Sequence, residues 1–145
     1  MTPAVKVKKL RAEARLPAYM TLGAAGADLY AAVVEPVRIA PGERSVIPIG
    51  IALEIPEGFE GQVRPRSGLA IRDGLTVLNA PGTIDADYRG ELNVIVINLG
   101  QKETWVRTGD RIAQLVIAPV VRAELRFVED LGETDRGAGG FGHTG

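Results

Sequence analysis

Proline and glycine recur along the chain at intervals too short for long helices. They divide it into short runs rich in β-branched and aliphatic residues, the clearest of which are residues 44–48, 51–55, 59–63, 92–98, 111–117 and 125–128. Many short strands separated by frequent turn residues are typical of an all-β sandwich or a jelly-roll-like β-barrel. At 145 residues, the chain is long enough to bury the core of one such domain.

One short helix and one tail interrupt this pattern. Ser67 is a natural N-cap, residues 68–73 are enough for a short helix, and Gly74 suits the left-handed conformation that ends a helix. From residue 132 onwards the chain has almost nothing apolar to bury. We therefore expect a folded domain over residues 1–131 and a flexible, glycine-rich lid over residues 132–145.

The run at residues 94–97 (VIVI) is apolar on both faces of the strand that it predicts. A sheet with one face in water would instead alternate apolar and polar residues. The pattern favours a second face that packs on another subunit. A central strand in the thick core of a monomer is the alternative that the pattern leaves open.

Composition excludes several classes of function. The formal net charge is −1 and no long basic run occurs, so a nucleic-acid polymer is a poor candidate partner. Without cysteine and with a single histidine, the chain can form neither disulfides nor a Cys- or His-rich metal site. No apolar run reaches membrane-spanning length, and the first ten residues lack the core of a signal peptide. We expect a soluble cytoplasmic protein with no membrane partner, although removal of an organelle-targeting peptide stays open.

Two stretches have the residue types of a phosphate site. Residues 64–70 (RPRSGLA) place an arginine and a serine at the start of the predicted helix, where anions are favoured, although this stretch taken alone is more often a capped helix with a solvated arginine. In residues 136–145 (RGAGGFGHTG), closely spaced glycines can turn backbone N–H groups inward beside Arg136. Phe141 could then stack on a planar ligand, which indicates a nucleotide. A flexible terminus is the competing interpretation.

Residues 79–91 (NAPGTIDADYRGE) are the most informative stretch and predict a β-hairpin. A carboxylate such as Asp85, close to bound phosphates, can act as a general base for water. Asp87 and Arg89 are explained more simply as solubilising charges at the hairpin tip, and Tyr88 leads into the apolar strand that follows.

Two further polar residues stand among apolar or small neighbours. Asp28 directly follows a turn of small residues and could approach a hydrated Mg²⁺, although such an aspartate is more often a turn residue. Gln114 lies within an apolar strand, so its amide needs a partner. That partner is either a backbone group or a phosphate.

Taken together and in order, five stretches resemble the motifs of the trimeric dUTPase family: residues 25–30 (AGADLY), 64–70, 79–91, 109–115 (GDRIAQL) and 136–145. The resemblance extends over nearly the whole chain. It implies a jelly-roll-like subunit and a homotrimer with three active sites, each built from all three chains. It also implies hydrolysis of dUTP to dUMP and pyrophosphate with Mg²⁺, which limits uracil incorporation into DNA and supplies dUMP for thymidylate synthesis.

The resemblance implies a role for individual residues. Asp85 would activate water for in-line attack on the α-phosphorus, and Asp28 would reach Mg²⁺ through water, the ion being held mainly by the triphosphate. The implied substrate contacts are Asn79, the backbone of Thr83, Ile84 and Asp85, and Asn93 for uracil; Tyr88 for the deoxyribose; Arg66, Ser67, Gly68 and Gln114 for the phosphates; and Arg136, Phe141 and Gly142 in the closing tail.

One residue departs from the family pattern, and two alternatives are weighed against it. His143 stands where many members carry a serine that binds phosphate, which leaves its side-chain contact open. A dCTP deaminase would need a glutamate to activate water at the cytosine ring and usually lacks this tail. A non-catalytic module on the same scaffold would not need the intact motif side chains seen here.

Overall fold

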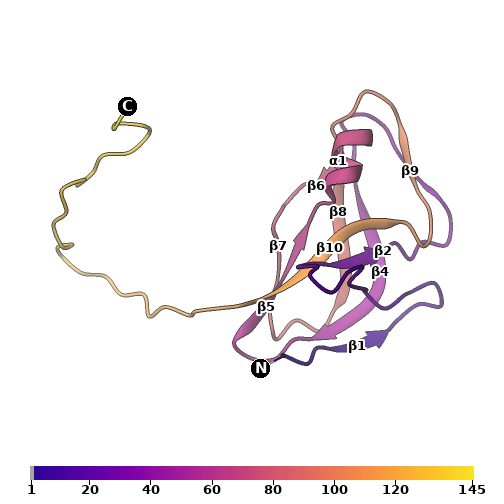
Figure 1. The fold of residues 1–145 in the computed structure, drawn as a ribbon, viewed down its shortest axis with the longest axis horizontal. Coiled ribbons are helices and arrows are strands. Elements are labelled where there is room, and N and C mark those ends of the chain that lie inside the picture. The colour runs from indigo at the N-terminus through magenta and orange to yellow at the C-terminus, as the bar shows by residue number, and fades with distance from the viewer. Residues whose placement is uncertain (1) are drawn as a thin grey trace.

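The computed structural model describes residues 2–145 and is drawn in Figure 1. Within those residues the regular secondary structure is almost entirely β, with one short helix. The elements are β1 (Lys6–Lys9), β2 (Ala27–Tyr30), β3 (Val37–Ile39), β4 (Arg44–Glu54), β5 (Phe59–Arg64), α1 (Ser67–Asp73), β6 (Leu75–Val77), β7 (Gly82–Ile84), β8 (Glu91–Asn98), β9 (Thr104–Val106) and β10 (Arg111–Pro119).

Two four-stranded sheets form the body of the protein. Their strand orders are β1-β4-β8-β6 and β2-β10-β5-β7, and a small two-stranded sheet, β3-β9, stands beside them. All neighbouring strands are antiparallel. The sheets do not close into a continuous barrel, so the architecture is a jelly-roll-like sandwich. The all-β fold class predicted from the sequence is confirmed.

The core lies between the two large sheets. Alternate residues of β8, among them Val94 and Val96, point inward and are buried, and Ala113 and Leu115 do the same from β10. They belong to one contiguous apolar cluster. Burial of each side chain of this size contributes about 1.5–3 kcal/mol, which holds the sheets together and fixes the strand registers that position the site.

Strand β4 is longer than the sequence indicated. The separate strands predicted at 44–48 and 51–55 are two halves of one strand, which bends at Gly50 (φ 76°) where its register with β8 shifts. A β-carbon at this position would stand 2.9 Å from that of Ala14 and 3.0 Å from that of Ala32. Only glycine suits both the left-handed backbone and the close approach.

The prediction of a β-hairpin at 79–91 is wrong. Strand β7 pairs with β5 in one sheet, whereas β8 pairs with β4 and β6 in the other. The turn residues correctly predict a change of direction, but a turn does not determine which strand its arms pair with. Residues 79–91 therefore cross from one sheet to the other.

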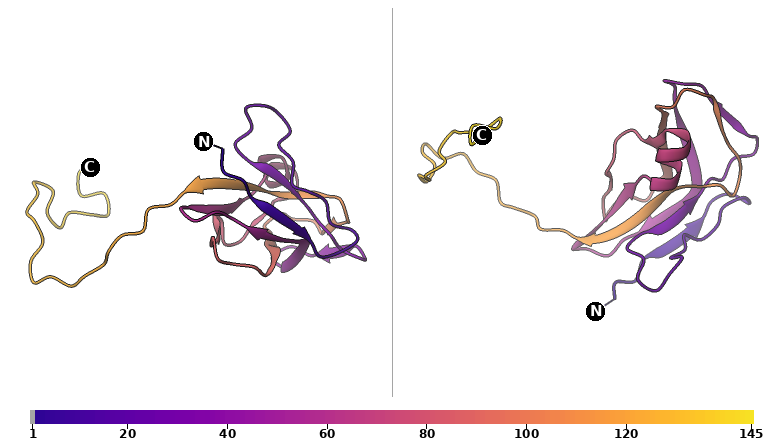
Figure 2. Two further views of the ribbon diagram at one scale, coloured as in Figure 1. Left: turned by 90° about the horizontal axis from the view of Figure 1, so that it is seen from below. Right: turned by 45° about the horizontal axis from the view of Figure 1, so that its top comes forward.

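The segment after β10 soon leaves the sandwich. Val120 N–H still donates to the carbonyl of Gly58 at 2.9 Å, and beyond this contact the chain runs outward from the body, as Figures 1 and 2 show. The strand predicted at 125–128 is wrong, because this segment lies away from both sheets and, within residues 2–145, its backbone has no neighbouring strand to pair with. Its apolar side chains Leu125 and Phe127 are exposed.

The predicted helix is present, with one correction at its start. Arg66, rather than Ser67, occupies the N-cap position, and its side chain makes no capping hydrogen bond. The helix ends at Gly74 (φ 69°), whose N–H donates to the carbonyl of Ala70, as expected for a left-handed C-terminal residue. Neither this helix nor any other part of residues 2–145 forms a helix long and apolar enough to span a membrane.

Candidate active site

The first cleft lies where α1 begins, beside the ends of β2, β5 and β10. We call it the α1 cleft; its volume is ≈ 410 Å³. Five predicted site residues meet here, although they come from three separate stretches of sequence. The lining residues are Met20, Ala24, Gly26, Asp28, Pro65, Arg66, Ser67, Gly68, Arg111 and Gln114.

Charge in the α1 cleft is organised around Asp28. This aspartate is buried and faces two guanidinium groups: Arg111 Nη1 lies 3.1 Å from one carboxylate oxygen and Arg66 Nε 3.7 Å from the other. Arg66 also donates to the backbone carbonyl of Arg111 at 3.0 Å. Two cations around one anion leave a net positive charge, which suits a bound polyphosphate.

Arg111 is a cleft residue that the residue-type reasoning missed. It stands in the predicted motif at 109–115, but no local feature distinguished it from a surface charge. The pairing of β10 with β2 carries it to Asp28. A strand-pairing prediction would have found it, because that pairing sets Arg111 opposite Tyr30, two residues along β2 from Asp28.

The side chain of Gln114 is held against Gly26. A β-carbon at position 26 would stand 2.9 Å from Oε1 of Gln114, so the glycine makes room for the amide. The only hydrogen bond of its amide nitrogen within residues 2–145 is a long one, 3.5 Å, to the carbonyl of Pro65. A weak backbone contact leaves this donor available to a ligand.

The second cleft, of ≈ 860 Å³, lies beside the residues that cross between the sheets, and we call it the Asp85 cleft. The predicted base Asp85 is exposed in the loop that follows β7. Five further acidic or basic side chains line the same cleft, and they come from this loop, the β4–β5 turn, β5 and the segment after β10. The lining residues are Ile55, Glu57, Gly58, Phe59, Glu60, Thr83, Asp85, Ala86, Asp87, Arg89, Val120 and Arg122.

Hydrogen bonds within the loop that carries Asp85 stabilise its conformation. The N–H of Tyr88 donates to the carbonyl of Asp85 at 3.1 Å, and Arg89 Nη1 donates to the carbonyl of Ala86 at 2.6 Å. Arg89 also lies 3.9 Å from the carboxylate of Glu54. The interpretation of Arg89 as a solubilising charge alone is therefore wrong, whereas Asp87 is exposed as expected.

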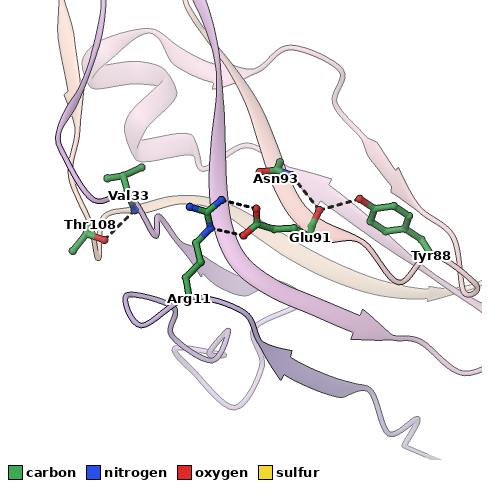
Figure 3. A network of polar contacts seen from close by, with 6 residues as sticks. All are labelled: Arg11, Val33, Tyr88, Glu91, Asn93 and Thr108. Atoms are coloured by element: carbon green, nitrogen blue, oxygen red, sulfur yellow. Dashed lines mark hydrogen bonds and ion pairs between the residues drawn. The ribbon is translucent and has the colours of Figure 1, made fainter.

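Two predicted substrate residues share one acceptor, as Figure 3 shows. The hydroxyl of Tyr88 donates to the backbone carbonyl of Glu91 at 3.0 Å, and Asn93 Nδ2 donates to the same oxygen at 3.1 Å. The carboxylate of Glu91 in turn accepts two hydrogen bonds from Arg11, of 2.6 and 2.9 Å. These bonds from Arg11 hold the pKa of Glu91 below its ordinary value.

Of the predicted uracil residues, Thr83 and Ile84 lie on β7, Asn79 and Asp85 flank that strand, and Asn93 lies on β8. Asn79 is exposed, and its side-chain nitrogen is adjacent to Gly82, where a β-carbon would stand 3.3 Å away. Thr83 is exposed, but the side chain of Ile84 is buried in the core, so only its backbone can face a ligand. The structure thus allows the backbone role that the resemblance assigns to Ile84.

The predicted site falls into three separate parts in a single chain. Among residues 2–145, none lines both the α1 cleft and the Asp85 cleft. The tail forms a third part: Arg136 Nε donates to the carbonyl of Gly139 at 2.7 Å, and Phe141 is fully exposed. Residues 2–145 contain no cluster of three or more His, Cys, Asp or Glu that could hold a metal ion.

Known proteins resemble this chain over nearly its whole length. Residues 12–145 match the family model for dUTPase. The deoxyuridine 5'-triphosphate nucleotidohydrolase of Syntrophotalea carbinolica is 62% identical over 144 residues, which cover 99% of this chain and 98% of that protein.

Two solved structures share the fold. A mutant dUTPase of Staphylococcus bacteriophage 80alpha, solved with dUpNHpp, has a TM-score of 0.90 at 31% identity, with 99% of each chain covered. A mutant dUTPase from phage phi11 of S. aureus, solved to reveal the coordination of a structural Mg(II) ion, has a TM-score of 0.80 at 29% identity, with 88% of this chain and 97% of that one covered.

Proposed function

Because the chain belongs to the dUTPase family and hydrolyses dUTP, we propose that the α1 cleft holds the triphosphate and that Asp85 activates the attacking water. The observation that carries this assignment is the convergence of Arg66, Ser67 and Gln114 on one positively charged cleft. A guanidinium, a hydroxyl and an amide donor are the groups that a polyphosphate chain requires.

The proposed reaction is an in-line displacement at the α-phosphorus. Asp85 accepts a proton from water as the water oxygen bonds to that phosphorus. The bond from the α-phosphorus to the oxygen that bridges it to the β-phosphorus breaks, and pyrophosphate leaves with the bonding electrons. Because phosphoryl transfer depends mainly on positioning and on stabilisation of charge, Arg66 and the amide of Gln114 would contribute by holding the phosphates in line.

Magnesium fits this site only as an ion carried by the substrate. Asp28 is one carboxylate already faced by two guanidinium groups, and residues 2–145 hold no cluster of three acidic or histidine ligands. Such a site suits a hydrated Mg²⁺ that keeps several waters, with Asp28 reaching it through one of them. When bound, the ion offsets negative charge on the phosphates.

Uracil and deoxyribose would be read by residues 79–93. Strand β7 is at the edge of its sheet and, within the described part of the chain, pairs with β5 alone, so one side of its backbone is free to hydrogen bond with the edge of a base. Sites that hydrogen bond a base reject analogues that leave buried groups unpaired. Asn79 and Asn93 would add contacts to uracil. Tyr88 would lie against the deoxyribose and leave no space for a 2′-hydroxyl.

A homotrimer would bring the separate clefts together. On the outer face of the β4–β8 sheet, Val46 is exposed and Ile95 and Ile97 are only partly covered, although they are apolar. Leu125 and Phe127 are exposed on the outgoing segment. Apolar surface of this kind supports association, and we assign each active site to residues from all three chains.

Residues 132–145 would then close over a neighbouring site as a lid on the domain formed by residues 1–131. Phe141 is fully exposed among residues 2–145 and would stack on the uracil. Arg136 and the backbone at Gly142 would bind the γ-phosphate. Closure would exclude water from the reacting phosphate. The ring of His143 lies over Gly139, where a β-carbon would be 2.5 Å from its Cδ2, so the lid is folded tightly on itself here.

Substrate selectivity tests this proposal. The enzyme with Mg²⁺ is given dUTP, dTTP, dCTP and UTP in turn, and pyrophosphate and ammonia are measured. We expect pyrophosphate from dUTP, with little from the other three and no ammonia. Ammonia from dCTP would instead indicate a deaminase. Equal cleavage of dUTP and UTP would contradict the assigned role of Tyr88. The product dUMP is the precursor that thymidylate synthesis requires, and removal of dUTP would limit uracil in DNA.

A further inference from the structure

Arg11 lies outside every motif of the site and yet contacts it. It lies two residues beyond the end of β1, next to Leu10, whose N–H donates to the carbonyl of Gly50 at the bend of β4. From there its guanidinium reaches across β4 to Glu91, as Figure 3 shows. Both of its hydrogen bonds to the carboxylate are short, 2.6 and 2.9 Å. A two-pronged pair of this kind fixes orientation as well as distance.

Glu91 needs such an anchor because of its place in the sheet. It is the first residue of β8, opposite Ala52 and just past the shift in register. A strand end beside an irregular pairing has few ladder hydrogen bonds to hold it. Its backbone carbonyl nevertheless accepts hydrogen bonds from both Tyr88 and Asn93. The position of that one oxygen therefore controls two proposed substrate contacts.

We propose that Arg11 is a positioning residue for sugar selectivity, which rests on the role proposed above for Tyr88. Its ion pair with Glu91 fixes the carbonyl oxygen to which the Tyr88 hydroxyl is bonded. The phenol ring is thereby held where it would exclude a 2′-hydroxyl. Without Arg11 the start of β8 loosens, the ring gains freedom, and UTP is admitted.

The chain supplies a matched control in the Arg38–Glu103 ion pair. It joins Arg38 on β3 to Glu103, the residue before β9, and is more exposed than the Arg11 pair. Neither of its members lines the two clefts or bonds to a predicted site residue. Arg38→Ala therefore removes an Arg–Glu pair of the same chemistry without touching Tyr88.

The first test compares the ratio of kcat/KM for dUTP to that for UTP in four full-length proteins. We expect Arg11→Ala to lower this ratio about tenfold, a size typical of coupling within one hydrogen-bond network. The ratio in Arg11→Lys should lie between those of the wild type and Arg11→Ala, since lysine keeps the charge but loses the two-pronged geometry of the guanidinium. Arg38→Ala should match the wild type. A ratio unchanged in Arg11→Ala, with activity on both nucleotides reduced equally, would mean a purely structural pair and would overturn the inference.

The second test asks whether Arg11 acts through Tyr88. Tyr88→Phe keeps the ring and removes the hydroxyl that bonds to Glu91. If Arg11 acts through that bond, the ratio of kcat/KM for dUTP to that for UTP in the double variant Arg11→Ala/Tyr88→Phe should be no lower than in the less selective of the two single variants. If the two substitutions instead lower this ratio independently, so that their factors multiply in the double variant, the inference is overturned. Failure of the proposed function would look different, since the unmodified enzyme itself would then show no preference for dUTP over UTP.

Discussion

The ring of Tyr88 lies directly over the α-carbon of Gly90. A β-carbon at position 90 would stand 2.6 Å from Cζ of that ring and 2.8 Å from Cε1, distances at which something must move. The Tyr88 hydroxyl also donates to the carbonyl of Glu91. The ring therefore occupies the space that a side chain at position 90 would fill, and its hydroxyl is fixed by a backbone acceptor. Position 90 therefore needs glycine to leave room for the Tyr88 ring, and not because its own backbone conformation requires glycine.

Gly90→Ala should therefore affect selectivity more than stability. Because the obstructing atoms belong to the end of a side chain, the ring can move aside without unfolding the loop. We expect the ratio of kcat/KM for dUTP to that for UTP to fall by about tenfold, with little change in Tm. Gly23→Ala is the control, since a β-carbon at position 23 would meet nothing within 4 Å. Wild-type selectivity in Gly90→Ala would refute this account of Tyr88.

Gly50→Ala should destabilise the fold through two separable effects. Gly42 has the same kind of backbone (φ 82°, against 76° for Gly50) but open space where a β-carbon would be. Gly42→Ala should thus cost only the left-handed strain, about 1–2 kcal/mol. Gly50→Ala should cost more, because its β-carbon would also press on Ala14 and Ala32. Urea unfolding of both variants gives the difference, and equal losses would contradict the packing described at the β4 bend.

Acid should weaken the link between Arg11 and Glu91. Hydrogen bonds from Arg11 lower the pKa of Glu91 from its ordinary 4.5 in the folded protein. A carboxyl whose folded pKa is depressed contributes stability above its unfolded pKa and loses it as the pH falls through the folded value. We expect the Tm difference between wild type and Glu91→Gln to be constant near neutrality and to shrink below pH 4.5. Glu129→Gln, on the outgoing segment, is the control. A Tm difference that grows as the pH falls would contradict a lowered pKa of Glu91 in the folded protein.

Two inactive variants should regain activity when mixed if each active site is formed by the α1 cleft of one subunit and the Asp85 cleft of another. Arg66→Ala disables the α1 cleft and Asp85→Asn disables the Asp85 cleft, and none of the residues that the structure describes lines both. Mixed and refolded together in equal amounts, they should regain about a quarter of the wild-type activity, because each shared site draws its two halves at random from identical subunits. Activity no higher than that of the separate variants would mean that each site lies within one chain.

Local signals in the sequence predict much of the fold and of the site. Short apolar runs between turn residues predict the β-sandwich, and Gly74 correctly predicts the end of α1 because a left-handed residue there needs glycine. In the α1 cleft, Arg66, Ser67 and Gln114 are brought together as phosphate binding requires.

Long-range relationships could not be predicted in the same way. Residues 79–91 contain the turn signals of a hairpin, but strand partners are chosen by core packing, and β7 pairs with β5. Residues 125–128 have the composition of a strand and lack a neighbour to pair with. Arg11 and Arg111 look like surface charges until tertiary contacts bring them to Glu91 and Asp28.

The chemistry assigned to Asp85 is the centre of this account, and Asp87 offers a close comparison. Both carboxylates are exposed, stand two residues apart and line the same cleft. The decisive measurement is single-turnover hydrolysis of dUTP with Mg²⁺, together with binding of a non-hydrolysable dUTP analogue, for Asp85→Asn and Asp87→Asn. Loss of a general base typically costs about 10²–10⁴ in rate. We predict such a loss in Asp85→Asn with binding retained, and near wild-type rates in Asp87→Asn. A wild-type rate in Asp85→Asn would contradict the assignment.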